Sequence, residues 1–491
     1  MKMKKRQFRV NIKVVRLYKV ICLLIIMSIM TGPSISTGQA APNDSTPARR
    51  VNIPYLGTYP PPPDTFTPAI FWFGKVDSTS NYADVRVWYY DDYFKINFHI
   101  IDRRLWYNPA PSPSDLTNWD AVSLYIKLDG NVGDVPTPNT YQFDAQINDF
   151  ETPRTSWQAV YRGNGSGWTP SSISFTTESG YRWESETVGG VNNDQNNRGW
   201  EMNYIVPFAS LGLPAKPAAN TIWGLGLVLH DRDDQSGTPV PDQTWPETMQ
   251  ANQPSTWGQM HFGVPEYNPP TSIPAETITI RNGLNGAVVN DGAVGGHTTC
   301  GAGLWPDIFN TWGQANYAGY DQFNIQNQWD LSDWPCFSKF YITFPLGTIP
   351  TSQNLLSATL SMYLFGGSAG PPDSYIQVMT VGEDWNEATL TWNNAPLATE
   401  NISGTWVHPI ESPDWVLYSW DVSRAVAQAY TSGQPLRLAM YSADSDYHTG
   451  KYFISSDGEG VGRPTLQIVF GSPCNSPGVT CYNVFLPLTQ H

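Results

Sequence analysis

The sequence is poor in charge, in cysteine and in long apolar runs. Charged residues make up only 14% of the 491 residues, where about 25% is usual. After residue 40 the chain holds 20 basic and 43 acidic residues, so these 451 residues carry a net charge of −23. DNA and RNA phosphates require clustered Lys and Arg, and this charge balance therefore argues against a nucleic-acid partner.

The lack of long apolar runs argues against a membrane-spanning helix beyond the N-terminus. Beyond residue 40 no segment approaches the 18 apolar residues of a spanning helix. The N-terminus has eight basic residues, then an apolar stretch at 20–30 and small residues near 40. This order predicts a secretory signal peptide over 1–40 and a secreted protein, extracellular or at the cell surface, with no membrane span after cleavage. An uncleaved anchor is the competing interpretation.

Cysteine is scarce, with five in the chain. Cys22 lies in the predicted signal peptide, which leaves four, and an even number in an exported chain indicates disulfides. Of the three possible connectivities we favour Cys300–Cys336 and Cys474–Cys481. Zinc is the alternative, but the sequence has no C-x-x-C pair to support it.

A helical period is also missing, and strand patterns are present instead. Apolar and polar residues alternate over 94–100, 122–128 and 358–364, which predicts half-buried strands. With 20 Trp, 25 Tyr and 41 each of Gly and Pro, the composition suits short strands joined by tight turns. One helix is expected, with Asp421 as N-cap and an end before Gly433. The predicted class is all-β, with two antiparallel, jelly-roll-like β-sandwich domains in tandem.

Pro-rich breaks divide the chain. Residues 60–63 are four prolines, and a second break surrounds the prolines at 269, 270 and 274. The predicted parts are a signal peptide (1–40), a Pro/Ser/Thr-rich leader (41–64), a first sandwich (65–266), a Pro-rich linker (267–274), a second sandwich (275–471) and a tail with a disulfide loop (472–491).

The first predicted sandwich resembles the family 9 carbohydrate-binding module and its DOMON-like relatives. The resemblance follows five ordered stretches spread over about 200 residues. These stretches are 88–96, 119–129, 201–208, 227–233 and 257–263.

That resemblance implies a sugar site, with a sugar ring held between aromatic side chains. Trp106, Trp119 and Trp245 are the candidate rings nearest the matching loops. An acidic residue of the family helps to hold the sugar, and Ser123 stands at its position, on the polar face of the predicted strand. These four residues are the predicted carbohydrate-binding set.

The second predicted sandwich resembles the DNRLRE-type domain, which is related to disaggregatase repeats and to carbohydrate-binding modules of some polysaccharide lyases. Its core match is the Asp-Trp-Asn-Glu segment at 384–396. The family's frequent Ser-Arg-Glu reads Ser-Ser-Asp at 455–457, and the missing Arg argues against an acidic glycan. The other matching stretches are 357–364, 420–423, 452–457 and 463–468.

Acidic loops raise the question of calcium, which takes six to eight oxygen ligands. The 129–134 loop alternates oxygen donors with turn-forming glycines, and a second acidic loop spans 231–234. The family 9 resemblance also implies structural calcium, whereas solvated loops are the alternative. The predicted calcium ligands are Asp129, Asn131, Asp134, Asp231 and Asp233.

Catalytic motifs are missing as well. The sequence has no H-E-x-x-H, no G-x-S-x-G and no phosphate-binding glycine loop. The prediction is therefore a non-catalytic, monomeric protein that binds polysaccharide or oligosaccharide, neutral rather than acidic. The alternatives are a structural or adhesive cell-surface protein, or a glycoside hydrolase or polysaccharide lyase.

Overall fold

The computed structural model describes residues 49–473, apart from 58, 60–64, 149–156, 182–189, 237, 301–306, 328–334, 348, 351–352, 369–371, 411–413 and 447. The predicted signal peptide, the predicted Cys474–Cys481 pair and the tail beyond residue 473 lie outside these residues. In the described part of the chain, no helix has the length and apolarity needed to cross a membrane.

The alternating segments form strands, and the all-β prediction is confirmed. Residues 94–100 lie in β4 (Tyr93–Ile101), 122–128 overlap β5 (Ala121–Lys127), and 358–364 lie in β18 (Asn354–Gly367). Their apolar members are buried, apart from the half-buried Leu128, because every second side chain of a strand points to the same face. A turn joins β3 (Ser80–Tyr89) to β4 in antiparallel pairing.

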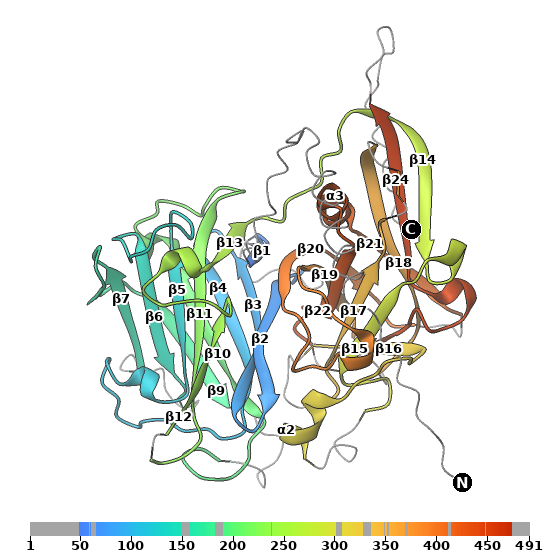
Figure 1. The fold of residues 1–491 in the computed structure, drawn as a ribbon. Helices are drawn as coiled ribbons and strands as arrows, with labels where there is room; N and C mark the ends of the chain where they lie inside the picture. The colour runs from blue at the N-terminus through green and yellow to red at the C-terminus, as the bar shows by residue number, and fades with distance from the viewer. Residues whose placement is uncertain are drawn as a thin grey trace, which may run out of the picture. The chain divides into compact units, whose positions relative to one another are not determined.

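The first half of the chain forms one sandwich (Figure 1). A five-stranded sheet with the order β2-β3-β4-β10-β9 faces part of a 13-stranded sheet, in the order β13-β11-β5-β6-β7-β8, with β12 paired to β11. A continuous apolar core fills the space between them. The remaining strands are β2 (Ala69–Asp77), β6 (Thr140–Gln146), β7 (Gln158–Gly163), β8 (Trp168–Pro170), β9 (Thr176–Tyr181), β10 (Gly199–Pro207), β11 (Ile222–Arg232), β12 (Pro239–Trp245) and β13 (Gly258–Phe262).

The second half forms another sandwich with its own core. A six-stranded sheet, β14-β24-β18-β23-β16 with β21 paired to β18, faces the other end of the 13-stranded sheet, β15-β17-β22-β19-β20. The strands are β14 (Ser272–Arg281), β15 (Asn290–Gly295), β16 (Gln322–Ile325), β17 (Ser338–Phe344), β19 (Ser374–Val381), β20 (Ala398–Val407), β21 (Val416–Asp421), β22 (Leu436–Ser442), β23 (Lys451–Ile454) and β24 (Thr465–Pro473).

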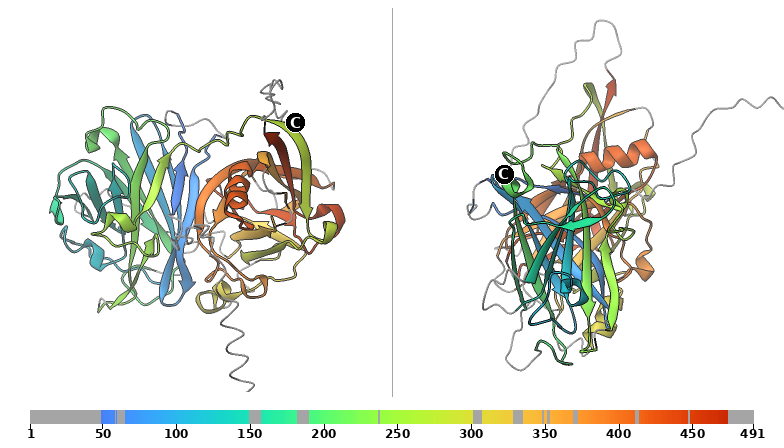
Figure 2. Two further views of the ribbon diagram at one scale, coloured as in Figure 1. Left: turned by 45° about the horizontal axis from the view of Figure 1, so that its top comes forward. Right: turned by 90° about the vertical axis from the view of Figure 1, so that its left-hand side faces the viewer.

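Two α-helices are present among the described residues, α2 (Ile308–Thr311) and α3 (Ser423–Ser432). The predicted helix corresponds to α3, which begins two residues after Asp421 and ends before Gly433, as expected. Asp421 still accepts a hydrogen bond from the Ser423 backbone N–H at 2.9 Å. Because α3 contacts β18 of one sheet and β22 of the other, it covers one end of the second sandwich (Figure 2).

A short strand connects the two halves. Residues 50–53, which the sequence placed in the leader, form β1 (Arg50–Ile53), and its apolar residues are buried. This strand pairs in parallel with β13 of the first half, and Arg50 pairs with Glu400 of β20 (Figure 1). Residues 272–274 of the predicted linker likewise belong to β14. The continuous sheet thus departs from purely antiparallel sandwiches at this strand.

A further apolar cluster lies between the halves. The five-stranded sheet contributes Ile70, Trp72, Val76, Tyr82 and Ile101 to it, and the rest of the cluster comes from the second half. Both faces of the five-stranded sheet are therefore covered. This explains why polar strand residues that would otherwise face water are buried, among them Asp84 and Arg86.

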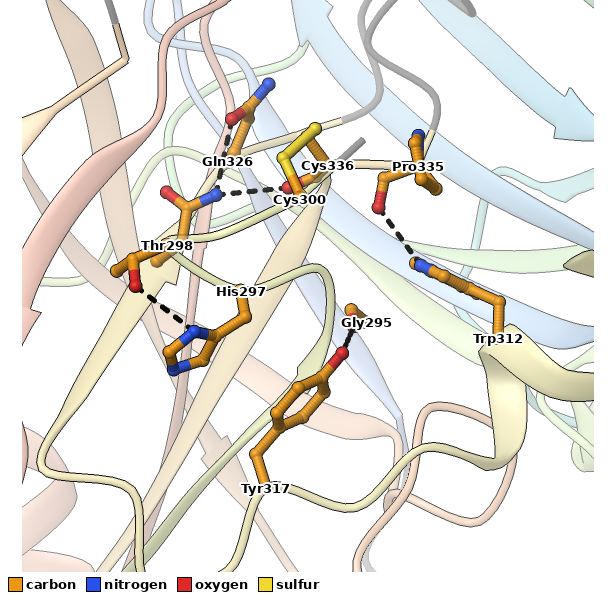
Figure 3. Close-up of a disulfide and its surroundings, with 10 residues drawn as sticks. Gly295, His297, Thr298, Cys300, Trp312, Tyr317, Gln326, Pro335 and Cys336 are labelled. Carbon is orange, nitrogen blue, oxygen red and sulfur yellow. Dashed lines mark hydrogen bonds between the residues drawn. A yellow bond between two sulfur atoms is a disulfide. The ribbon is translucent and has the colours of Figure 1, made fainter. Parts of the chain in front are cut away.

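The Cys300–Cys336 disulfide is present, which confirms that prediction. Its neighbours hold the surrounding loops through main-chain carbonyls (Figure 3). Asn324 donates to the carbonyl of Cys336 at 3.0 Å, and Trp312 donates to that of Pro335 at 3.0 Å. Tyr317 donates to the Gly295 carbonyl at 2.7 Å.

Replacing both disulfide cysteines by serine is expected to lower the free energy of unfolding by about 2–4 kcal/mol. The bridge spans 36 residues of sequence, so it restricts the unfolded chain considerably. Urea unfolding followed by Trp fluorescence measures the change. Cys300→Ser alone should lose as much as the double variant, and an unchanged midpoint in both variants would contradict the prediction.

Candidate functional site

Ser123 lies within a chain of hydrogen bonds on the outer face of the first sandwich. It sits on β5, opposite Asp144 of β6 and Val228 of β11. Its hydroxyl donates to Asp144 Oδ1 at 2.5 Å and lies 3.0 Å from His230 Nε2. Since the single hydroxyl proton goes to Asp144, His230 must donate to Ser123 Oγ. The other ring nitrogen of His230 lies 3.1 Å from Asp242 Oδ1.

The neighbouring strand β6 thus places a carboxylate, that of Asp144, beside Ser123. Asp144 is buried, and burial raises the pKa of its carboxyl. Ser123, His230 and Asp242 follow the order of a nucleophilic triad, but Ser123 has no exposed surface and its proton is held by Asp144. A buried serine cannot reach a substrate, so this arrangement supports the sheet and offers no nucleophile.

The three predicted tryptophans do not gather around Ser123. Trp245 of β12 points to the core, is 1% exposed and packs on Phe71 with ring centroids 4.5 Å apart. A ring so enclosed presents no face to a sugar. Trp106 is buried too, and only Trp119 is partly exposed. The stacking role of Trp119 stays a prediction.

The predicted calcium ligands of the 129–134 loop bind protein neighbours. Asp129 forms an ion pair with Lys127. Asn131 donates to the Trp257 carbonyl at 2.8 Å and accepts from Gln259 at 3.0 Å. Asp134, the third predicted ligand of the loop, accepts from Ser255 at 2.6 Å. Asp233 of the second predicted loop pairs with Arg103 at 3.0 Å. In the described part of the chain, the one group of at least three His, Cys, Asp or Glu side chains that could share a metal ion does not include Asp129, Asp134 or Asp233, and calcium at these residues stays a prediction.

The remaining predicted ligand, Asp231, lies in a different acidic cluster. One carboxylate oxygen from each of Asp102, Asp120 and Asp231 lies within 4.8 Å of the other two. Asp102 follows β4, Asp120 precedes β5, and Asp231 lies in β11. The two sheets of the first sandwich therefore meet at this cluster. Sequence reasoning missed Asp102 and Asp120, whose only signal was their place at strand ends.

The electrostatics of this aspartate cluster favour a cation. Burial and the neighbouring carboxylates raise the pKa of Asp102 and Asp120 well above normal and that of Asp231 to about 8. Backbone N–H groups reach both oxygens of Asp120, at 2.6 and 2.7 Å. Asp231 Oδ1 is buried without a hydrogen-bond partner. Hard oxygen donors with an orphaned carboxylate oxygen fit calcium, and Asp102, Asp120 and Asp231 would hold it.

A surface hollow lies in the second sandwich, within the Asp-Trp-Asn-Glu segment. It has a volume of about 470 Å³ and is lined by Asp384, Trp385, Asn386, Thr389, Leu390 and Asn394. Trp385 is half-buried and its ring meets that of Tyr341 at 72°. Arg437 donates to Asp384 through two nitrogens, at 3.0 and 2.7 Å. The sequence did not single out this place, because Trp385 lies in the segment that carries the DNRLRE resemblance and was therefore expected to have a structural role.

Internal hydrogen bonds fix the shape of the hollow. Asn394 accepts from the Thr391 N–H at 2.7 Å and donates to the Thr389 carbonyl at 2.8 Å. Asn386 accepts from the Ala388 N–H at 2.9 Å and caps a short 3-10 helix, η9 (Glu387–Thr389). An aromatic ring, a carboxylate and side-chain amides therefore stand in fixed positions around one opening. These are the groups that stack on a sugar ring and bind its hydroxyls.

Comparison with known proteins bears on the second sandwich. Residues 309–470 match the model of carbohydrate-binding module family 96, which covers about a third of the chain and includes the hollow. No curated protein matches the chain.

Among solved structures, a family 9 carbohydrate-binding module from Caldicellulosiruptor kristjanssonii in complex with cellotriose is 15% identical. The similarity covers 45% of this chain and 100% of the module's chain, with a TM-score of 0.30. The glucose complex of a family 9 module from that organism is 14% identical, covers 40% and 86%, and has a TM-score of 0.28. The segment 309–470 is similar to family 96 carbohydrate-binding modules, as the match to the family model shows.

Proposed function

We propose that this chain is a non-catalytic protein that binds polysaccharide at the hollow around Trp385. The observation that carries the proposal is the family 96 match, since it spans every residue lining the hollow. The partly exposed Trp385 ring would stack on the apolar face of a sugar ring. Asp384 and Asn386 stand beside it as hydrogen-bonding partners for hydroxyls.

A neutral glycan suits the charges better than an acidic one. Asp384 is the charged residue lining the hollow, and the nearby guanidinium of Arg437 is already occupied by it. The net charge of −23 after residue 40 adds long-range repulsion toward a polyanion. Export through the signal peptide is part of the proposal, and the Cys300–Cys336 bridge is in keeping with an oxidising compartment. Calcium bound at the aspartate cluster is also part of the proposal.

Trp385→Ala is expected to weaken glycan binding about 30-fold, the loss of about 2 kcal/mol typical of a central aromatic anchor. The measurement is retardation of residues 41–491 in affinity gels that contain neutral or acidic polysaccharides. Wild type should be retarded by a neutral glycan, and Trp385→Ala should be retarded markedly less.

Trp415→Ala is the matched control, because Trp415 is an exposed tryptophan outside the hollow. Thermal melts of both variants check that the fold is intact. Retardation that is lost in Trp415→Ala and kept in Trp385→Ala would refute the proposal that the glycan binds at the hollow. No retardation of wild type by any glycan, with or without calcium, would refute carbohydrate binding, and newly formed reducing ends or unsaturated products would point to an enzyme.

A further inference from the structure

A second cavity lies where the two sandwiches meet. It has a volume of about 510 Å³, within the usual range of ligand sites. The first half contributes Pro54, Thr67 and residues 264–267 to its walls. The second half contributes parts of β19 and β20 and the beginning of α3. Neither half encloses this space alone.

Tyr375 provides an aromatic wall of the cavity. It pairs with Trp406 across β19 and β20, and the two ring centroids lie 5.3 Å apart. A Cβ at Gly404 would lie 2.4 Å from Cζ and the hydroxyl oxygen of Tyr375, so glycine is what allows the ring to lie across β20. Burial raises the pKa of Tyr375 to about 12. The phenol therefore keeps its proton at neutral pH and can both donate and accept.

Charged groups face the cavity from the second half and from the connecting segment. Asp421 uses Oδ1 to accept from the N–H and hydroxyl of Ser423, at 2.9 and 2.5 Å, which leaves Oδ2 for a ligand. Arg424 is held by Glu400 at 2.5 Å. Glu266 adds an exposed carboxylate. Two carboxylates and an already paired guanidinium leave the lining negative, which disfavours an anionic ligand.

Amide side chains fix the walls relative to one another. Asn401 accepts from the Asn52 N–H at 2.7 Å and donates to its carbonyl at 2.9 Å. Gln377 donates to the Pro68 carbonyl at 2.6 Å and accepts from the Ile70 N–H at 3.3 Å. Each bond joins the first half to the second, so the cavity is formed before any ligand arrives and binding orders little of the chain.

We infer that this junction cavity binds a sugar unit of a neutral glycan, as a site separate from the hollow around Trp385. The inference rests on the proposed carbohydrate binding and adds a second binding site for the glycan. Tyr375 stacks on the sugar ring, while Asp421 and Glu266 accept from its hydroxyls. Because both halves build the walls, one glycan-binding site of this chain is a product of its tandem architecture.

The test is isothermal titration of residues 41–491 with cellotriose, xylotriose and mannotriose, and with trigalacturonate as an acidic probe. Wild type should bind a neutral trisaccharide at two sites. Tyr375→Ala should lose one site, and Tyr375→Phe should weaken that site about three- to tenfold through the lost hydroxyl. Gly404→Ala should weaken the same site, because its methyl group displaces the ring.

Gly366→Ala is the matched control, since a Cβ there meets Tyr452 at an ordinary 3.4 Å. Binding that is unchanged in Tyr375→Ala and in Gly404→Ala but reduced in Trp385→Ala would overturn this inference and leave the proposed function intact. Binding of trigalacturonate alone would overturn the neutral assignment. No binding by wild type to any probe, together with no retardation in the glycan gels, would overturn both proposals.

Discussion

Replacing Asp84 by alanine is expected to lower the free energy of unfolding by about 3–5 kcal/mol, the usual cost of leaving a buried charge without its partner. Asp84 lies on β3, between the sandwiches, and has no exposed surface. It accepts from the hydroxyls of Tyr82 and Tyr441, at 2.5 and 2.6 Å. Lys339 of the second half donates to the Tyr82 hydroxyl at 3.1 Å.

The lysine explains the size of the expected loss. Lys339 is fully buried, and its ammonium lies 3.6 Å from the ring centroid of Trp392 and 4.2 Å from that of Trp72. Burial lowers the pKa of Lys339, whereas Asp84 opposes that shift. Without Asp84 the lysine must lose its proton or remain charged in an apolar cluster. Both outcomes favour the unfolded chain.

Urea unfolding followed by Trp fluorescence measures the loss. The double variant Asp84→Ala/Lys339→Met should recover part of it, because one of the two buried cations that Asp84 balances is removed while Arg86 remains. Asp77→Ala, a change at a partly exposed aspartate at the end of β2, should cost less than about 1 kcal/mol. The interpretation fails if Asp84→Ala unfolds at the wild-type urea concentration.

Calcium is expected to stabilise the chain by about 4 kcal/mol at a thousandfold excess over its dissociation constant. The ion would bind Asp102, Asp120 and Asp231, whose carboxylates are buried and close together. In the unfolded chain these groups are separate and bind the ion weakly. The measurement is thermal unfolding of residues 41–491 with EDTA and with added calcium.

The pH dependence follows from the raised pKa values. In the metal-free folded protein the pKa of Asp231 is about 8, against 3.8 for an ordinary aspartate. The folded chain then binds more protons than the unfolded chain between these values, so metal-free stability falls as pH rises from about 4 to about 8. Calcium competes with those protons. Its stabilising effect should therefore be small at pH 5 and large at pH 8.

Asp231→Asn is the sharpest variant for this cluster. It should abolish the calcium response and make the metal-free protein less sensitive to pH, because one of the three charges is gone. Asp134→Asn changes a residue of the 129–134 loop, whose carboxylate is bound to Ser255, and should keep the full response. If the stabilisation by calcium were lost in Asp134→Asn and kept in Asp231→Asn, the calcium site would lie in the 129–134 loop and not at the aspartate cluster.

The strands could be predicted from sequence because their signal is local. Successive side chains of 94–100 or 358–364 point to opposite faces of the sheet. Burial of one face therefore produces an alternation of apolar and polar residues in the sequence. The Pro-rich segment was harder to interpret. Pro274 lies in β14, an edge strand whose pairing with β24 is interrupted between Pro274 and Glu276. An edge strand with a bulge tolerates proline, so composition alone suggested a linker where a strand begins.

The sites were less predictable, because their members come from separate strands. Asp102 and Asp120 join Asp231 only when the ends of β4 and β5 meet the end of β11. Asp144 binds Ser123, yet it lies 21 residues away on the next strand. The junction cavity requires Tyr375 and Pro54, from different halves of the chain, to line the same space. No periodicity in a single segment encodes such proximity.

The strand β1 has a consequence for how the chain reaches its fold. Asn52 is bonded to Asn401, which lies 349 residues further along. The first described strand can pair with β13 earlier, but it acquires its partners in β20 only after most of the protein has been synthesised. Contacts of such sequence separation slow folding, because a long loop must close before they form. We expect the contacts of β1 with β20 to form late, as the step that joins two preformed sandwiches.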